Sequence, residues 1–186
     1  MQAMELEIPG CYLFDINRFE DDRGDFLKLF HSGTFLDLGL ETNFKESYIT
    51  KSHENVLRGM HFQIPPFDHA KIVSCITGRV QDGLVDLRKG SPTFGQSVSL
   101  ELSENDGHIL YIPKGIAHGF LSLMNDSRMW YLVSSVHNST CDLGIHYNSV
   151  NIAWKNTQPE RSCIISQRDN DFPLLSDFNS PFIFKS

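Results

Sequence analysis

Short apolar segments separated by turn residues recur along most of the chain, and this rhythm limits the folds that the chain can adopt. The segment 96–103 alternates strictly, so that Val98, Leu100 and Leu102 fall on one face and polar side chains on the other. A Glu-Asn-Asp-Gly turn at 104–107 separates it from the next segment. Closely spaced strands of this kind are typical of an antiparallel β-sandwich or jelly roll.

The remaining segments extend the same pattern. Strands are predicted at 11–19, 25–30, 46–52, 56–63, 71–88 with a break near 78, 108–113, 118–124 and 129–136. Helix is expected only in short peripheral pieces, around 32–38 and near the C-terminus. From about residue 148 the periodicity weakens, and this segment is expected to pack over the barrel. The sequence therefore predicts an all-β jelly-roll sandwich or barrel that forms a single domain over residues 1–186.

Composition narrows the classes of function. A chain of 186 residues can form one domain with a sizeable core. Its net charge of −7 argues against a nucleic-acid partner. No apolar run is long enough to span a bilayer and no signal-peptide pattern is present, so we expect no membrane partner and a cytoplasmic location. Cys11, Cys75, Cys141 and Cys163 form no CxxC pair and are expected to be reduced thiols.

The segment VLRGMHFQ places two polar residues, Arg58 and His61, inside an apolar strand. They form either an anion clamp with a catalytic base, or a snorkelling arginine beside a buried, hydrogen-bonded histidine. On a regular strand Gly59 and His61 share one face and Arg58 lies on the other. Arg58 could then reach a shared ligand only around the strand end, or through a twist or bulge.

A metal site is an alternative use of the histidines. Small jelly rolls often bind a metal through an HxH pair, a nearby glutamate and a distant histidine. Here Gln63 occupies the second position of that pair, and no glutamate follows in IPPFDHAK. His61, His69 and His118 could still hold zinc or iron, so a metal-dependent cupin enzyme stays an alternative. The favoured expectation is no metal.

Three further residues are candidates for the same pocket as His61. Lys71 opens an apolar strand, either as a solvated edge residue or as a fixed cation that stabilises an enolate oxygen. Tyr131 in MWYLV is either a buried aromatic or a proton donor. His118 in IPKGIAHGF re-enters a strand after a turn, which suits close approach of a ligand. Together with Arg58 and Lys71 it predicts a cationic cluster suited to an anion such as pyrophosphate.

Five motifs, taken together, resemble those of nucleotide-sugar 4-keto 3,5-epimerases. They are DDRGDF, VLRGMHFQ, VDLRKGSPTFGQ, IPKGIAHGF and ISQRDNDFPLL, in that order, between about residues 21 and 175. The resemblance implies a cupin-like jelly roll that needs no cofactor and forms a homodimer by exchanging N-terminal strands. It implies inversion of C3, C5 or both in a nucleoside-diphosphate-linked 4-keto-6-deoxy sugar. Such a reaction would serve bacterial surface polysaccharide synthesis, for capsule or O-antigen.

The resemblance also implies catalytic roles. His61 resembles the general base of the family, and Asp169 resembles the carboxylate that hydrogen-bonds this base. Lys71 matches the lysine near the C4 oxygen of the sugar. Tyr131 matches the tyrosine that returns a proton from the opposite face.

Binding roles follow from the same motifs. Arg58 and His118 match pocket residues around the pyrophosphate and the hexose. Arg23 of DDRG matches an arginine that the partner subunit contributes to the nucleotide site.

Several rim positions depart from the usual thymidine-sugar pattern. Lys28 stands where the family normally has Glu, and Glu46 and Tyr48 stand where it has Gln and Asn. Val136 and His137 replace a pair of tyrosines. A carboxylate can accept two hydrogen bonds from guanine, so Glu46 favours GDP, or CDP, in place of dTDP. The lost tyrosines leave open a hexose or a heptose, one carbon or both, and a 3,4-ketoisomerase as an alternative reaction.

Overall fold

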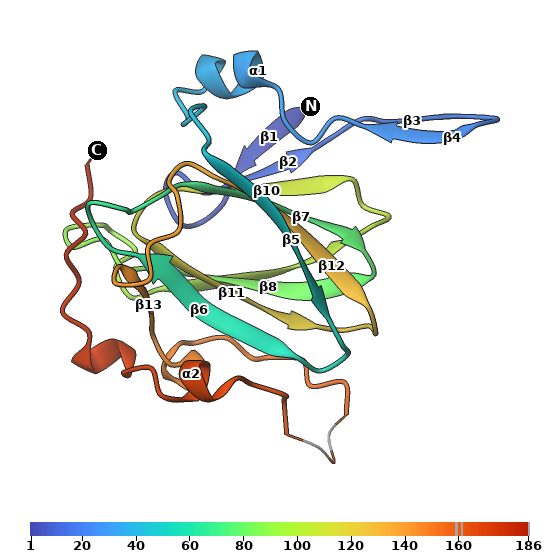
Figure 1. The fold of residues 1–186 in the computed structure, drawn as a ribbon. Helices are drawn as coiled ribbons and strands as arrows, with labels where there is room; N and C mark the ends of the chain where they lie inside the picture. The colour runs from blue at the N-terminus through green and yellow to red at the C-terminus, as the bar shows by residue number, and fades with distance from the viewer. Residues whose placement is uncertain (159, 161, 186) are drawn as a thin grey trace.

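Two antiparallel β-sheets face each other and enclose the core (Figure 1). The six-stranded sheet has the order β1-β2-β10-β7-β12-β5, and the five-stranded sheet has the order β13-β6-β11-β8-β9. A computed structural model describes residues 1–158, 160 and 162–185 of the chain. The predicted all-β class is confirmed, and the helices are short and peripheral.

The elements follow one another along the chain with these bounds. The strands are β1 (Gln2–Glu5), β2 (Tyr12–Asp15), β3 (Arg18–Asp21), β4 (Gly24–Leu27), β5 (Glu46–Ser52), β6 (Leu57–Gln63), β7 (Lys71–Thr77), β8 (Arg79–Asp86), β9 (Ser97–Ser103), β10 (His108–Ile112), β11 (Ile116–Ser122), β12 (Ser127–Val133) and β13 (Asp142–Gly144). The helices are α1 (Ser32–Asp37), η1 (Tyr147–Ser149), α2 (Gln167–Asn170) and η2 (Leu175–Asp177).

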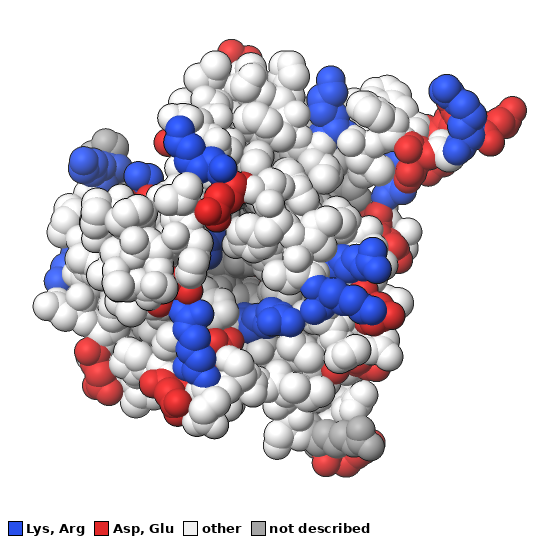
Figure 2. Space-filling view, in the orientation of Figure 1, with Lys and Arg blue, Asp and Glu red and all other residues white. Residues whose placement is uncertain are grey.

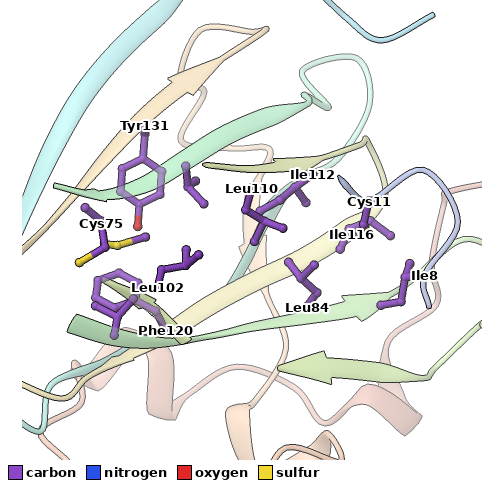
Figure 3. Close-up of a cluster of buried hydrophobic side chains, with 13 residues drawn as sticks. Ile8, Cys11, Cys75, Leu84, Leu102, Leu110, Ile112, Ile116, Phe120 and Tyr131 are labelled. Carbon is purple, nitrogen blue, oxygen red and sulfur yellow. The ribbon is translucent and has the colours of Figure 1, made fainter. Parts of the chain in front are cut away.

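The main core lies between the two sheets. Leu84 of β8 and Leu110 of β10 are fully buried there (Figure 3). Leu102, Val98 and Leu100 of β9 pack in the same cluster, so the predicted alternation of this strand is confirmed. Burial of such aliphatic side chains contributes about 1.5–3 kcal/mol each and drives the two sheets together.

The outer face of each sheet is covered by a different segment of the chain. Phe35 of α1 stacks on Phe14 of β2 with ring centroids 4.8 Å apart, which covers part of the six-stranded sheet. The C-terminal segment packs against the five-stranded sheet through Ile152 and Trp154. A Cβ at Gly83 of β8 would lie 2.7 Å from Ile152 and 2.8 Å from Trp154, so only glycine allows this close approach.

An irregularity in β6 changes the direction of its side chains. His61 pairs with His118 of β11, whereas Arg58 pairs with Phe120, so three steps along β6 match two steps along β11. Gly59 lies inside this irregularity with a φ of +126°, and a Cβ there would lie 2.5 Å from the Cα of Gly119. Of the routes expected for Arg58, around the strand end or through a twist or bulge, the structure shows the bulge-like irregularity, which lets Arg58 and His61 line the same cavity.

The hairpin β3–β4 extends away from both sheets (Figure 1). Phe19 and Phe26 are directly opposite each other in this hairpin and are 63% and 57% exposed. Large aromatic side chains on a projecting hairpin have no cover within one chain.

None of the helices in residues 1–158, 160 and 162–185 is long and apolar enough to span a bilayer.

Candidate active site

A cavity of about 370 Å³ opens between the two sheets at one end of the sandwich. The molecule is visibly hollowed between β5 and β6, with Lys and Arg side chains gathered around the hollow (Figure 2). The lining residues that bear polar side chains come from both sheets and the adjoining loops: Glu46, Tyr48, Thr50, Arg58, His61, Gln63, His69, Lys71, His118, Tyr131, Ser135, His137 and Asp142.

His61 and Asp169 form a hydrogen-bonded pair at one wall of this cavity. Nε2 of His61 lies 2.9 Å from Oδ1 of Asp169, and the side chain of His61 is 31% exposed. Because Nε2 faces the carboxylate, Nδ1 is the ring nitrogen left for a ligand. Phe172 packs edge-on against the imidazole at 5.7 Å and limits its rotation.

The short helix α2 delivers Asp169 to this position. Ser166 caps the helix by accepting a hydrogen bond from the Asp169 N–H. Oδ2 of Asp169 accepts the N–H of Gly59 at 3.1 Å. Burial by itself would raise the pKa of Asp169, but the hydrogen bonds and charge of His61, with the Gly59 N–H, hold it below its ordinary value. The carboxylate therefore stays ionised at neutral pH.

Lys71 begins β7 and reaches across to the opposite sheet. Its Nζ donates a hydrogen bond to the carbonyl of His61 at 3.1 Å, and the side chain is buried. Burial lowers the pKa of Lys71 to about 8, against the opposing effect of Asp142 and Asp82. The residue is thus a buried, fixed ammonium group at neutral pH.

Tyr131 projects from β12 into the space between the sheets (Figure 3). It is 6% exposed, and burial first, then Tyr48 and Asp82, raises the pKa of its hydroxyl well above the ordinary value. Tyr48 of β5 is directly opposite in the strand pair and stacks on it, with ring centroids 4.8 Å apart and planes at 13°. The hydroxyl therefore keeps its proton, as a donor requires.

His118 belongs to a second histidine–carboxylate pair. Its Nε2 lies 2.8 Å from Oδ2 of Asp82, and both side chains are buried. Asp82 was missed from the sequence, since β8 and β11 pair only in the fold. The alternation of QDGLVD, which puts an aspartate on a core-facing position of a strand, is the signal that could have found it.

Arg58 lines the cavity with a partly fixed guanidinium. Its Nε donates to Ser52 Oγ at 3.0 Å and one terminal nitrogen donates to the Lys51 carbonyl at 3.1 Å. Arg58, Lys71 and His118 all line the cavity, as the predicted cationic cluster requires.

The rim residues Glu46, Tyr48 and His137 also line the cavity. Oε1 of Glu46 accepts the backbone N–H of His137 at 3.0 Å, so part of this carboxylate is already used locally. Asp142 of β13 was not singled out from the sequence. It lines the cavity and forms an ion pair with Arg168 of α2 at 2.8 Å. Val136, by contrast, is 47% exposed and does not line the cavity.

Two predicted binding residues lie outside the cavity of their own chain. Arg23 is at the tip of the β3–β4 hairpin, where it pairs with Asp21, and its side chain is 89% exposed. Lys28 follows β4 and is exposed. Neither belongs to the lining residues.

The three histidines weighed as metal ligands each have another partner. His61 bonds Asp169, His118 bonds Asp82, and Nδ1 of His69 lies 2.9 Å from Nε2 of Gln63. Gln63 also donates to the carbonyls of Phe67 and Val136 and so ties two loops together. In the part of the chain that the structure describes, no three His, Cys, Asp or Glu side chains are arranged to hold a metal ion.

The two sheets supply different chemical groups to the same space. His61 comes from the five-stranded sheet, and Tyr131 comes from the six-stranded sheet that faces it. A flat, conjugated intermediate held between them would meet a base on one face and a hydroxyl donor on the other, with the Lys71 ammonium near its edge.

Comparison with known sequences identifies relatives along nearly the whole chain. The profile of the dTDP-4-dehydrorhamnose 3,5-epimerase family matches residues 5–177. The dTDP-4-dehydrorhamnose 3,5-epimerase of Salmonella typhimurium is 36% identical over 179 residues, which cover 94% of this chain and 96% of that protein.

Solved structures agree with the sequence comparison. The dTDP-6-deoxy-D-glucose-3,5-epimerase of Legionella pneumophila, in complex with dTDP-4-keto-L-rhamnose, superposes with a TM-score of 0.93 at 28% identity and covers 100% of this chain and 99% of its own. ChmJ of Streptomyces bikiniensis, a 3'-monoepimerase in complex with dTDP-quinovose, has a TM-score of 0.84 at 29% identity and covers 92% and 86%.

Proposed function

The chain belongs to the dTDP-4-dehydrorhamnose 3,5-epimerase family and is an isomerase that acts on nucleotide sugars, and we propose that it inverts C3, C5 or both in a 4-keto-6-deoxy sugar. The observation that carries this proposal is the placement of His61 and Tyr131 on facing sheets around one cavity. Inversion by deprotonation and reprotonation needs a base and a donor on opposite faces of the reacting carbon, and the facing positions of His61 and Tyr131 support these roles.

The first step removes a proton from the carbon next to the ketone. Nδ1 of His61 takes the proton, the C–H electrons form the C=C bond, and the carbonyl electrons move to the C4 oxygen. Asp169, 2.9 Å from Nε2, stabilises the imidazolium that forms. The buried ammonium of Lys71 stabilises the enolate oxygen.

The second step returns a proton from the opposite face. The Tyr131 hydroxyl gives its proton to the carbon, the enolate electrons form the new C–H bond, and the ketone is restored. The tyrosinate then takes up a proton and His61 releases one, so the enzyme returns to its starting state. Arg58 and His118 are proposed to hold the diphosphate and the sugar.

Proton exchange in D₂O tests this function. Incubation with 4-keto-6-deoxy sugars, followed by NMR, should reveal deuterium at C3, at C5 or at both, which also reports the scope of the reaction. His61→Asn should reduce exchange by about 10²–10⁴-fold. Absence of exchange with every such sugar would refute the epimerase proposal, and movement of the carbonyl without inversion would identify a 3,4-ketoisomerase instead. Metal analysis of the active protein tests the metal-dependent alternative.

The carrier is proposed to be dTDP, with GDP or CDP as the alternative that the rim favours. The relatives described above are dTDP-sugar enzymes or bind dTDP sugars, which supports dTDP. Glu46 favours GDP because a carboxylate can accept two hydrogen bonds from guanine. However, its Oε1 already accepts the His137 N–H, so only one oxygen is left for the base. Calorimetric titration with the three nucleoside diphosphates should give the tightest binding with dTDP, and tighter binding of GDP would reverse the choice.

A homodimer is proposed to complete the site. Arg23 and Lys28 lie outside the cavity of their own chain, on and beside a hairpin that projects away from it. Phe19 and Phe26 on this hairpin are exposed, as expected of residues that a second copy covers. Exchange of N-terminal strands would bring Arg23 to the nucleotide site of the partner.

The place of the reaction is proposed to be the cytoplasm, in the synthesis of deoxy sugars for bacterial capsule or O-antigen. The family name, which specifies a dehydrorhamnose substrate, supports a role in polysaccharide synthesis. The sugar itself, hexose or heptose, follows from the same NMR assay with both substrates.

A further inference from the structure

The stacking of Tyr48 on Tyr131, the proposed proton donor, has no part in the reaction steps above. The two residues are directly opposite on β5 and β12, and their rings are nearly parallel at 13° with centroids 4.8 Å apart. Tyr131 is 6% exposed whereas Tyr48 is 42% exposed, so Tyr48 forms the outer layer of the pair. Both rings line the cavity.

A tyrosine that reprotonates carbon must hold its hydroxyl at one point above the enolate. The Tyr131 ring is bounded on one face by Tyr48 and meets the edge of the His118 ring at 6.1 Å. β5 is the edge strand of its sheet, so Tyr48 is the outermost neighbour that Tyr131 has on this side. Removing the Tyr48 ring would leave Tyr131 free to tilt toward solvent.

We propose that Tyr48 is a positioning residue that fixes the Tyr131 ring by stacking, and so makes proton return occur on the face opposite His61. The inference rests on the proposed epimerase function. In it, Tyr48 influences the face from which the enolate is reprotonated and not the rate at which the enolate forms. Offset stacking of aromatic rings is favourable and geometrically selective, which suits this role.

The enolate has two fates, and they can be counted separately in D₂O. Return of a proton by His61 restores the starting configuration. Because the His61 side chain is 31% exposed, its proton can exchange with solvent first, and the recovered substrate then carries deuterium. Delivery by Tyr131 gives the inverted product. The ratio of inverted product to labelled substrate therefore measures the position of the donor, independently of how fast the enolate forms.

The experiment compares wild type, Tyr48→Leu, Tyr48→Phe and, as a reference for loss of the donor, Tyr131→Phe, with a dTDP-linked 4-keto-6-deoxyhexose. Tyr48→Leu should lower the ratio of inverted product to labelled substrate at least about tenfold. This is smaller than the about 10²–10⁴-fold that a well-placed general acid contributes, because the donor is misplaced and not removed. Label should still enter recovered substrate at a rate within about threefold of wild type. Tyr48→Phe keeps the ring and should restore the wild-type ratio.

Several outcomes would overturn the inference. The first is a ratio of inverted product to labelled substrate in Tyr48→Leu that equals that of wild type. The second is a Tyr48→Leu variant in which labelling and inversion fall by the same factor. The third is a Tyr48→Phe variant whose ratio is as low as that of Tyr48→Leu. If circular dichroism shows that Tyr48→Leu does not fold, the ratio measured in Tyr48→Phe alone shows whether proton return depends on the ring of Tyr48 or on its hydroxyl. A wild-type enzyme that incorporates no deuterium would instead refute the proposed function, so the two failures are distinguishable.

Discussion

At the scale of single residues, the site depends on groups whose environment changes their ordinary behaviour. His61, Lys71 and Tyr131 could be chosen from the sequence because each is a polar group placed in an apolar strand. Asp82 could not be chosen, because its partner His118 is 36 positions away and only the pairing of β8 with β11 joins them. Local sequence patterns predict which residues are unusual, whereas pairing across strands decides which of them meet.

The first prediction concerns the pH dependence set by Lys71. Its pKa is lowered to about 8 by burial, so the side chain is a cation below that pH and neutral above it. Stabilisation of the enolate should therefore be lost as the pH rises through about 8, and kcat/KM, which reports the free enzyme, should fall there. The measurement is kcat/KM against pH from 6 to 10, at about 0.5-unit steps. In Lys71→Met the low-pH rate should drop and the limb near 8 should vanish; persistence of that limb would assign it to another group.

A second prediction concerns Gly59, where the backbone φ is +126° and a Cβ would lie 2.5 Å from Gly119. Gly59→Ala should destabilise the protein by about 1–3 kcal/mol, because both the backbone conformation and the contact become unfavourable. Activity should fall as well, since Arg58 and His61 flank this residue. Urea unfolding and steady-state kinetics measure the two effects. Gly24→Ala, with a φ of +124° and nothing within 4 Å, is the matched stability control that isolates the contact.

At the scale of elements, the sequence predicted most strands but not the exact positions of their irregularities. Alternation identified β9 and its buried face, since a side-chain period of two is visible in a single segment. A twist or bulge in β6 was one of the routes expected for Arg58, but the position of the extra step could not be predicted, because it appears only when β6 is matched to β11. That same step gives Arg58 and His61 a common cavity, so the least predictable part of the strand is the part the site uses.

The third prediction concerns the cap of α2, a four-residue helix that carries Asp169. Ser166→Ala removes the hydrogen bond from the Asp169 N–H and should cost about 0.5–2 kcal/mol of stability. Because Asp169 orients His61, kcat should fall more than KM rises. Chemical denaturation and kinetics test this, with Ser176→Ala, an exposed serine outside the site, as the control. A variant that loses stability but keeps its kcat would show that the cap does not position the dyad.

At the scale of the whole molecule, two facing sheets hold the reacting groups on opposite walls. The jelly roll could be predicted from the spacing of strands and turns. The packing of the C-terminal segment could be predicted from its weak periodicity, and the segment contacts the five-stranded sheet through Trp154. The proposed second copy of the chain has no local signature of this kind in the sequence. What supports it is the exposure of Phe19 and Phe26 on the projecting hairpin, which only the structure reveals.

The fourth prediction is that the nucleotide alone stabilises the folded molecule. A ligand present at about 100 times its Kd adds about 2.7 kcal/mol. For a chain of this size that corresponds to a rise in Tm of roughly 5–10 °C. Thermal unfolding with dTDP, GDP and CDP at equal concentration should rank dTDP highest. Equal shifts for all three would mean that the pocket recognises the diphosphate and not the base.

The fifth prediction concerns assembly. Replacing Phe19 and Phe26 of the projecting hairpin with Ser should shift the protein from dimer to monomer in analytical ultracentrifugation, because these rings are exposed in a single chain. Activity should fall with the dimer fraction. Phe94→Ser, at a similarly exposed phenylalanine on another loop, should leave the sedimentation coefficient unchanged.

The distance between the hairpin that carries Arg23 and the cavity that contains His61 has a genetic consequence. If each site draws these two residues from different chains, an Arg23→Ala subunit and a His61→Asn subunit, each inactive alone, can complement one another. Their mixed dimer contains one doubly altered site and one intact site. Random assembly from equal amounts makes about half of the dimers mixed, and so restores about a quarter of wild-type activity. Two defective alleles expressed in one cell would then produce an epimerase activity that neither produces by itself.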